Sequence, residues 1–137
     1  MSHLASLTHT SPAPRGRTAS IALWTVQIAL AGMFILAGGS KLLGAPPMVA
    51  LFNTIGIGQW FRYVTGLIEV GSGVALLIPA VVVFGALALV PTMIGAVITQ
   101  LFIVKASPVP PAILLFGVVL VLWVRRHELP IGRQAAR

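Results

Sequence analysis

The sequence contains no cysteine and very little charge. None of its 137 residues is Cys, and 8% are charged against 58% hydrophobic. The missing thiols exclude disulfides, cysteine nucleophiles and cysteine-ligated metals. A soluble globular domain has about 25% charged residues, and a chain with so few could not cover a surface that faces water. The composition therefore favours a protein that has the lipid bilayer as its solvent.

Acidic residues and histidines are scarce as well. The chain has two acidic residues, Glu69 in the interior and Glu128 in the C-terminal tail, so a pair of neighbouring carboxylates for acid–base catalysis is excluded within one chain. The three histidines, at positions 3, 9 and 127, lie near the chain ends and form no pair that could hold haem. With no phosphate-binding loop or catalytic triad, the sequence predicts neither a metal site nor a covalently held cofactor.

Basic residues outnumber acidic ones, and most of them lie near the two ends. The formal net charge is +7, with Arg15 and Arg17 before the first apolar segment and four arginines from Arg125 onward. Basic flanks of membrane segments remain in the cytoplasm. We therefore expect a multi-pass protein of the cell inner (plasma) membrane with both termini in the cytoplasm. The arginines are too sparse, and too free of interleaved aromatic residues, to predict a nucleic-acid partner.

Long apolar segments predict four membrane-spanning helices. They cover about residues 21–43, 61–78, 80–105 and 110–124, close to the ~20 apolar residues that one crossing needs. A single broken helix in place of the second and third spans is the main rival, but its length exceeds one crossing. Short connections favour antiparallel neighbours. The predicted fold is all-α, a polytopic membrane protein in which residues 20–125 form an antiparallel four-transmembrane-helix bundle.

Polar segments and prolines mark the predicted boundaries. Residues 1–19 are rich in Ser, Thr and Pro and are expected to be a disordered basic cytoplasmic tail. Residues 126–137 are expected to be a second basic cytoplasmic tail. The two prolines at 46–47 predict the start of a short interfacial helix. Pro79 is expected in the first turn of the third span, and Pro91 is expected to kink that span.

Polar and small residues fall on one face of each of the first three spans, at about 100° per residue. The first face holds Gln27, Gly38 and Lys41. The second holds Arg62, Thr65, Gly66, Glu69, Ser72 and Gly73. The third holds Gly85, Thr92, Gly95, Ala96 and Thr99, with Gln100 at its edge. Such faces suit close helix packing and should point away from the acyl chains. Their depth predicts that four side chains meet in one layer in the outer half of the bundle: Lys41, Glu69, Thr99 and Gln100.

Two interpretations of Glu69 carry equal weight. The structural one is a buried ion pair with Lys41 or with Arg62, which avoids the desolvation of a lone carboxylate and fixes the register between helices. The functional one is a ligand-binding or proton-handling group, the usual role of an ionisable side chain inside a membrane. The two are compatible, and Glu69 is the candidate catalytic residue. Gln27 is expected to bond between helices, and Arg62 to lie at the membrane surface.

The segments GGSKLLG (38–44) and FRYVTGLIEVGSGVALLIP (61–79) end the first span and cover the second. In order and spacing they resemble the DoxX-like family of small four-helix membrane proteins, over about residues 22–125. The resemblance implies a bundle with Lys41 and Glu69 as its paired polar centre. Named relatives include a subunit of a thiosulfate:quinone oxidoreductase and a component of a membrane oxidoreductase complex, and more distant ones resemble chaperones or cargo receptors. Gln100 stands where the family leads us to expect histidine, which counts against redox chemistry that needs an imidazole.

Together these features predict an accessory or anchor component of a membrane redox system. A quinone or a lipid is the candidate occupant of a polar centre made of Lys41, Glu69, Thr99, Gln100, Gln27 and Arg62. Two alternatives stay open: a small membrane enzyme that uses Glu69 as acid or base on a lipophilic substrate, and a chaperone-like membrane interaction protein. The expected partners are membrane lipid, a protein of the redox complex and a second copy of the chain.

Overall fold

The computed structural model describes residues 16–128. Predictions for residues 1–15 and 129–137 lie outside the described part of the chain. Every described element is helical, which confirms the all-α prediction. In chain order the elements are α1 (Arg17–Leu42), α2 (Pro46–Ile55), α3 (Gln59–Ala75), α4 (Val82–Thr99), a π-helical turn η1 (Gln100–Val104), α5 (Val109–Arg125) and a 3₁₀ turn η2 (Arg126–Glu128).

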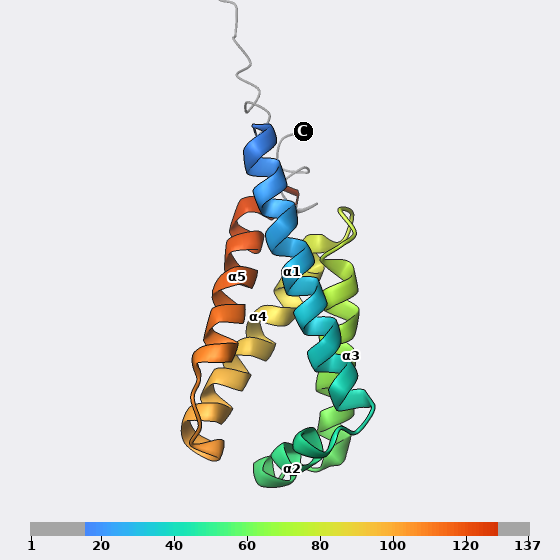
Figure 1. Cartoon of the computed structure of the whole chain (residues 1–137), viewed down its shortest axis with the longest axis vertical. Helices are drawn as coiled ribbons and strands as arrows, with labels where there is room; N and C mark the ends of the chain where they lie inside the picture. The colour runs from blue at the N-terminus through green and yellow to red at the C-terminus, as the bar shows by residue number, and fades with distance from the viewer. Residues whose placement is uncertain (1–15, 129–137) are drawn as a thin grey trace, which may run out of the picture.

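The four long helices form two pairs that diverge toward one end of the molecule (Figure 1). α1 packs mainly on α3, and α4 packs mainly on α5. Within each pair the helices run in opposite directions, and the pairs meet at the end where α1 begins. At the other end the short helix α2 contacts α3 on one side and η1 on the other. The diverging ends of the two pairs are therefore bridged by α2.

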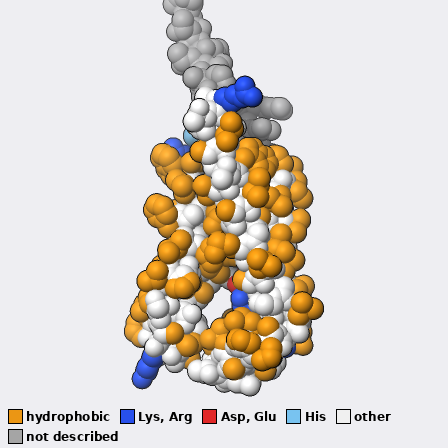
Figure 2. All heavy atoms as spheres, in the orientation of Figure 1, with side chains coloured by type: hydrophobic (Ala, Val, Ile, Leu, Met, Phe, Trp, Pro, Cys, Tyr) orange, Lys and Arg blue, Asp and Glu red, His pale blue; other side chains and the backbone are white. Residues whose placement is uncertain are grey.

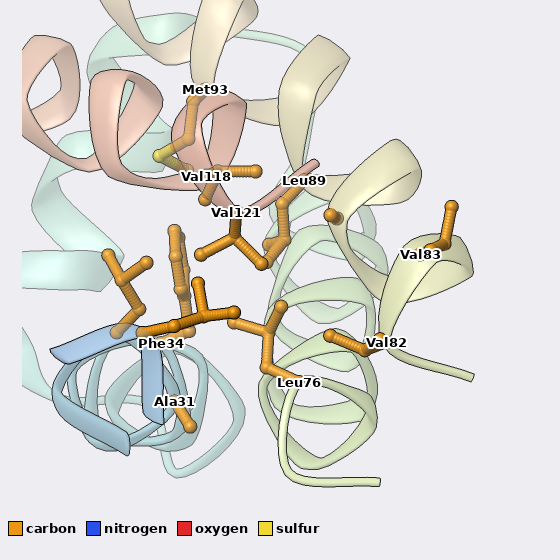
Figure 3. Close-up of a cluster of buried hydrophobic side chains, with 12 residues drawn as sticks. Ala31, Phe34, Leu76, Val82, Val83, Leu89, Met93, Val118 and Val121 are labelled. Atoms are coloured by element: carbon orange, nitrogen blue, oxygen red, sulfur yellow. The ribbon is translucent and has the colours of Figure 1, made fainter. Parts of the chain in front are cut away.

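Apolar side chains from α1, α4, α5 and the turn after α3 fill the end where the pairs meet. Phe34 of α1, Leu76 just after α3, Leu89 of α4 and Val121 of α5 are fully buried there (Figure 3). Lipid tails are as apolar as these side chains, so close packing rather than transfer from water stabilises this core. The core therefore holds one end of the bundle firmly and leaves the other end to polar contacts and to α2.

Glycine faces glycine where α1 crosses α3. A Cβ atom on Gly38 would lie 2.7 Å from the carbonyl oxygen of Gly66, and a Cβ on Gly66 would lie 3.1 Å from that of Gly38. Neither position can take a larger residue unless a backbone moves, because small residues are what allow such an approach. Both glycines belong to the predicted inward faces, and both are buried as predicted.

Large apolar side chains cover most of the face of the bundle that Figure 2 shows. Leu36, Phe102 and Phe116 are among the most exposed. This surface would be poorly solvated by water and suits lipid. Two described helices are long and apolar enough to cross a membrane, Arg17–Leu42 and Val82–Val104, and Val109–Arg125 is apolar but shorter.

The start of α1 differs from the prediction. The helix begins at Arg17 rather than near residue 21, so the last residues of the predicted tail 1–19 are helical. The backbone N–H of Ser20 already donates to the carbonyl of Gly16 at 3.0 Å. Small and polar residues such as these tolerate a helix once a long apolar segment follows. A boundary predicted from residue polarity alone was therefore a few residues too late for the start of α1.

The position of Pro79 is a second correction. It does not lie in the first turn of the third span, because α4 begins only at Val82. Pro79 lies in the turn before it, where the N–H of Val81 donates to the carbonyl of Ile78 at 3.1 Å. A tight turn suits proline, which has a fixed φ and no N–H to donate. Pro91 lies inside α4, and the kink expected there stays a prediction.

The short helix α2 begins at Pro46, as the two prolines predicted. It ends at Ile55 and is followed by Gly56, whose φ of +81° is the left-handed conformation that favours glycine after the end of a helix. Gly58, with φ of +119°, then turns the chain into α3. These two turns place α2 beside the start of α3.

Candidate functional site

A cavity of about 810 Å³ lies between the two helix pairs. Its walls come from the second half of α1, the first half of α3, the second half of α4 and the start of α5, and α2 closes one end. Figure 2 shows the corresponding hollow on one side of the bundle, with an acidic and a basic side chain at its inner wall. The cavity follows from the divergence of the pairs, because α1 and α3 contact α4 and α5 closely only at the opposite end.

Lys41 and Glu69 form an ion pair on the wall of this cavity. Nζ of Lys41 donates a hydrogen bond to Oε2 of Glu69 at 2.8 Å, and the side chains are 13% and 5% exposed. Lys41 lies in the last turn of α1 and Glu69 in the middle of α3. The pair therefore links the two helices beyond the glycine contact. Of the two partners considered for Glu69, the structure pairs it with Lys41.

Arg62 binds the backbone at the end of α1 and does not pair with Glu69. Its Nε donates to Oε1 of Gln59 at 2.7 Å, its Nη1 donates to the carbonyl oxygen of Lys41, and its guanidinium lies 4.4 Å from the ring centre of Tyr63. The carbonyl of Lys41 belongs to the last turn of α1, where helical partners are missing. Arg62 therefore holds the end of α1 in place. It is buried but does not line the cavity.

Thr99 and Gln100 lie on the opposite wall of the same cavity. Gln100 begins the π-helical turn η1, a departure from the α-helix that often occurs at functional sites. Its Oε1 is buried and has no hydrogen-bond partner among the described residues. The layer predicted from the sequence is thus spread over two walls: the ion pair on one and Thr99 with Gln100 on the other.

The remaining polar side chains of the cavity wall are satisfied by their own helices. The hydroxyls of Ser40, Thr65 and Thr92 donate to carbonyls three or four residues earlier, those of Ala37, Phe61 and Ala88. Such bonds leave a hydroxyl less available to a ligand. The polar groups left to face the cavity are therefore the ion pair, the Thr99 hydroxyl and the Gln100 amide.

Gln27 lies far from this cavity, in the closed end of the bundle. Its side chain is 0% exposed, its Nε2 donates to the carbonyl of Leu76 at 2.7 Å, and its Oε1 accepts from Nε of Arg125 at 2.7 Å. Gln27 therefore forms hydrogen bonds between helices, as the sequence predicted. It does not join the other residues of the predicted polar centre.

Two features of the structure were not predicted from the sequence: the burial of Arg125 and the contribution of α2 to the cavity wall. Arg125 was counted with the basic flank after the last span, but it is 6% exposed and lies over the ring of Trp24. The side chains of α2 were the second omission, since Met48 and Leu51 line the cavity. The two prolines indicated the helix but not the surface that it would cover.

The sequence of the cavity and its ion pair matches a known protein family. The sequence model of the DoxX-like family matches residues 25–124, which includes every wall of the cavity and the whole ion pair. No match was found among curated proteins or among solved structures. Within residues 16–128, no three His, Asp or Glu side chains lie together as a metal site would require.

Proposed function

The chain belongs to the DoxX-like family of membrane proteins, and from this premise we propose that it binds a lipophilic molecule in the cavity between its two helix pairs. The polar head of this molecule rests against the Lys41–Glu69 pair, and its apolar part lies between α2 and α5. One observation carries the proposal: a cavity of about 810 Å³ with an almost entirely apolar wall holds one buried ion pair. Ligand sites are typically cavities of about 300–1,000 Å³ with a few converging polar groups.

All four long helices span the bilayer in this proposal. α3 and α5 have 17 residues each, which at about 1.5 Å per residue gives a length of roughly 26 Å. The hydrocarbon core is about 30 Å thick, so both helices reach across most of it. Exposed apolar side chains on every long helix support the same arrangement. The bundle is then an antiparallel four-span protein, with α2 at one membrane surface.

The basic end of the bundle faces the cytoplasm. Arg17 at the start of α1 and Arg125 and Arg126 at the end of α5 lie at the same end of the molecule. Positively charged flanks favour the cytoplasmic side. Both termini are then cytoplasmic, and the cavity lies in the outer half of the bundle.

The redox role and the enzyme role stay predictions. A quinone in the cavity would accept a hydrogen bond from Lys41, which fits an accessory component of a redox system. A lipophilic substrate in the same place would meet Glu69 as its acid or base. A protein partner and a second copy of the chain are likewise predictions, and the proposal for the cavity does not depend on them.

Native mass spectrometry of the chain purified in mild detergent tests the proposal. We expect a small lipophilic molecule to remain bound to the unmodified protein. Gly95 lines the cavity and has open space around its Cβ position, so the side chain of Gly95→Leu should narrow the cavity and weaken retention of the molecule. Gly71 also has open space but lies outside the cavity, so Gly71→Leu is a matched control that should retain it.

Two results would contradict the proposal. One is a chain that carries no small molecule under any mild extraction. The other is a molecule that Gly95→Leu and Gly71→Leu retain equally, because it would then be bound elsewhere. An absorbance spectrum of the same sample separates the roles, since a bound quinone absorbs in the near ultraviolet and favours the redox prediction.

A further inference from the structure

Both partners of the ion pair have hydrogen-bonding positions left over. Lys41 carries three N–H groups on Nζ, and one of them is directed at Oε2 of Glu69. The other carboxylate oxygen, Oε1, accepts no hydrogen bond from a described residue. Among these residues, the one side-chain polar atom that is both fully buried and without a partner is Oε1 of Gln100. Oε1 of Glu69 is therefore accessible, and the pair presents a donor and an acceptor side by side.

The charges on the cavity wall cancel. Lys41 and Glu69 are the charged residues on its described lining, and their ion pair is neutral as a unit. A ligand with a net charge would bring an uncompensated charge against apolar walls, which is costly. The cavity therefore suits a polar head that carries no charge.

A hydroxyl group fits this pair of positions best. A hydroxyl is both a donor and an acceptor, so it can donate to Oε1 of Glu69 and accept from Nζ of Lys41 at once. An ether, ketone or quinone oxygen can only accept. Such a head would cover the carboxylate oxygen without giving it a hydrogen bond, and an unsatisfied polar group costs affinity.

The part of the cavity between α2 and α5 accepts an apolar tail. Met48, Leu51 and Ile55 of α2 line one side, and Pro111 and Leu114 of α5 line another. These side chains offer dispersion contacts and no hydrogen bonds. A tail of aliphatic carbon is the chemistry that they match.

From these four observations we propose that the ligand of the cavity is a neutral lipophilic alcohol. Its hydroxyl lies between Nζ of Lys41 and Oε1 of Glu69, and its tail lies between α2 and α5. The inference rests on the proposed function, which places a lipophilic molecule in the cavity, and adds the chemistry of its head. It favours a hydroxyl-bearing lipid, or the reduced form of a quinone, over a quinone or a fatty acid.

The test compares three probes that share one tail: 1-hexadecanol, its methyl ether and hexadecanoic acid. Each is titrated into the full-length protein in mild detergent, and native mass spectrometry gives an apparent Kd. We expect the alcohol to bind about tenfold tighter than the ether or the acid, the size of effect expected for one lost hydrogen bond to a buried group. Gly95→Leu should weaken binding of all three, and Gly71→Leu should change none.

Glu69→Gln gives an independent readout. The amide oxygen can keep the hydrogen bond from Lys41, and the amide NH₂ then replaces the acceptor Oε1 with a donor. The preference for the alcohol over the ether should disappear, so that the two apparent Kd values become about equal, whatever the change in overall affinity. The wild-type comparison decides the inference even where this variant fails to fold.

Each outcome has one meaning. A preference for the alcohol that Gly95→Leu removes supports the inference. An ether or acid that binds as tightly as the alcohol, again sensitive to Gly95→Leu, overturns the alcohol and leaves the proposed function standing. Binding of all probes that is unsaturable or insensitive to Gly95→Leu overturns both.

Discussion

Nζ of Lys41 lies 2.8 Å from Oε2 of Glu69, and this contact joins the end of α1 to the middle of α3. It is the one ion pair among the described residues and lies where the core gives way to the cavity. The same pair therefore has two roles. It fixes the position of α3 relative to α1, and it supplies the polar group on an apolar wall.

Removal of one charge should destabilise the protein more than removal of both. Lys41→Met leaves a buried carboxylate without its cation, and Glu69→Leu leaves a buried ammonium. Each single variant should lose about 3 kcal/mol of unfolding free energy, whereas the double variant should recover most of that loss. Chemical unfolding in detergent, followed by circular dichroism, measures all four proteins. Losses that simply add in the double variant would contradict the coupling.

The glycine contact between α1 and α3 should tolerate no methyl group. Gly38→Ala places a Cβ 2.7 Å from the carbonyl oxygen of Gly66, and overpacking of this kind costs about 1–3 kcal/mol. The neighbouring Gly39 has nothing within 4 Å of its Cβ position, so Gly39→Ala is the matched control and should not lower the Tm. Equal Tm values for the two variants would show that the helices do not cross at Gly38.

Gln27 should be required for stability rather than for ligand binding. Gln27→Leu keeps the volume but removes the donor to the Leu76 carbonyl and the acceptor of Arg125 Nε. We expect a loss of about 1–3 kcal/mol, the cost of losing these two hydrogen bonds between buried groups. Retention of the bound molecule per folded protein should stay at the wild-type level. Thr25→Val, which removes an exposed bond within α1, is the control for loss of a polar group.

The absence of cysteine makes the proposed orientation directly measurable. Ala106, in the turn before α5, and His127, in η2, are both exposed and lie at opposite ends of α5. In intact cells a membrane-impermeant maleimide should label Ala106→Cys and should label His127→Cys only after the membrane is opened. The reverse pattern would place the termini outside, and labelling of both in intact cells would contradict four spans.

Helical periodicity was enough to predict which residues of α3 point inward. Gly66, Glu69 and Ser72 recur at three- and four-residue spacing on α3, and all three are buried. With one acidic residue in the apolar part of the chain, the number of possible ion pairs was also small. Depth along the neighbouring span indicated Lys41, and the shared face of the second span indicated Arg62. Local spacing thus located the polar residues of the site.

The choice between those two partners required the three-dimensional structure. Arg62 is closer to Glu69 in sequence, yet its guanidinium turns to the end of α1 and to Gln59. The divergence of the helix pairs could not be predicted from the sequence either, because it depends on which side chains from distant segments meet where the pairs pack. On α4 this changes the role of a predicted face: Gly85 packs against α3, while Thr92 and Gly95 line the cavity.

The hollow of Figure 2 opens on the side of the bundle, across its long axis. In the proposed orientation that side faces acyl chains, so a ligand reaches Lys41 and Glu69 by diffusion within the leaflet and never crosses bulk water. The relevant concentration is then its mole fraction among the surrounding lipids. A protein that holds its ligand weakly by the standards of aqueous assays would still be fully occupied where that ligand makes up a few molecules in every hundred lipids.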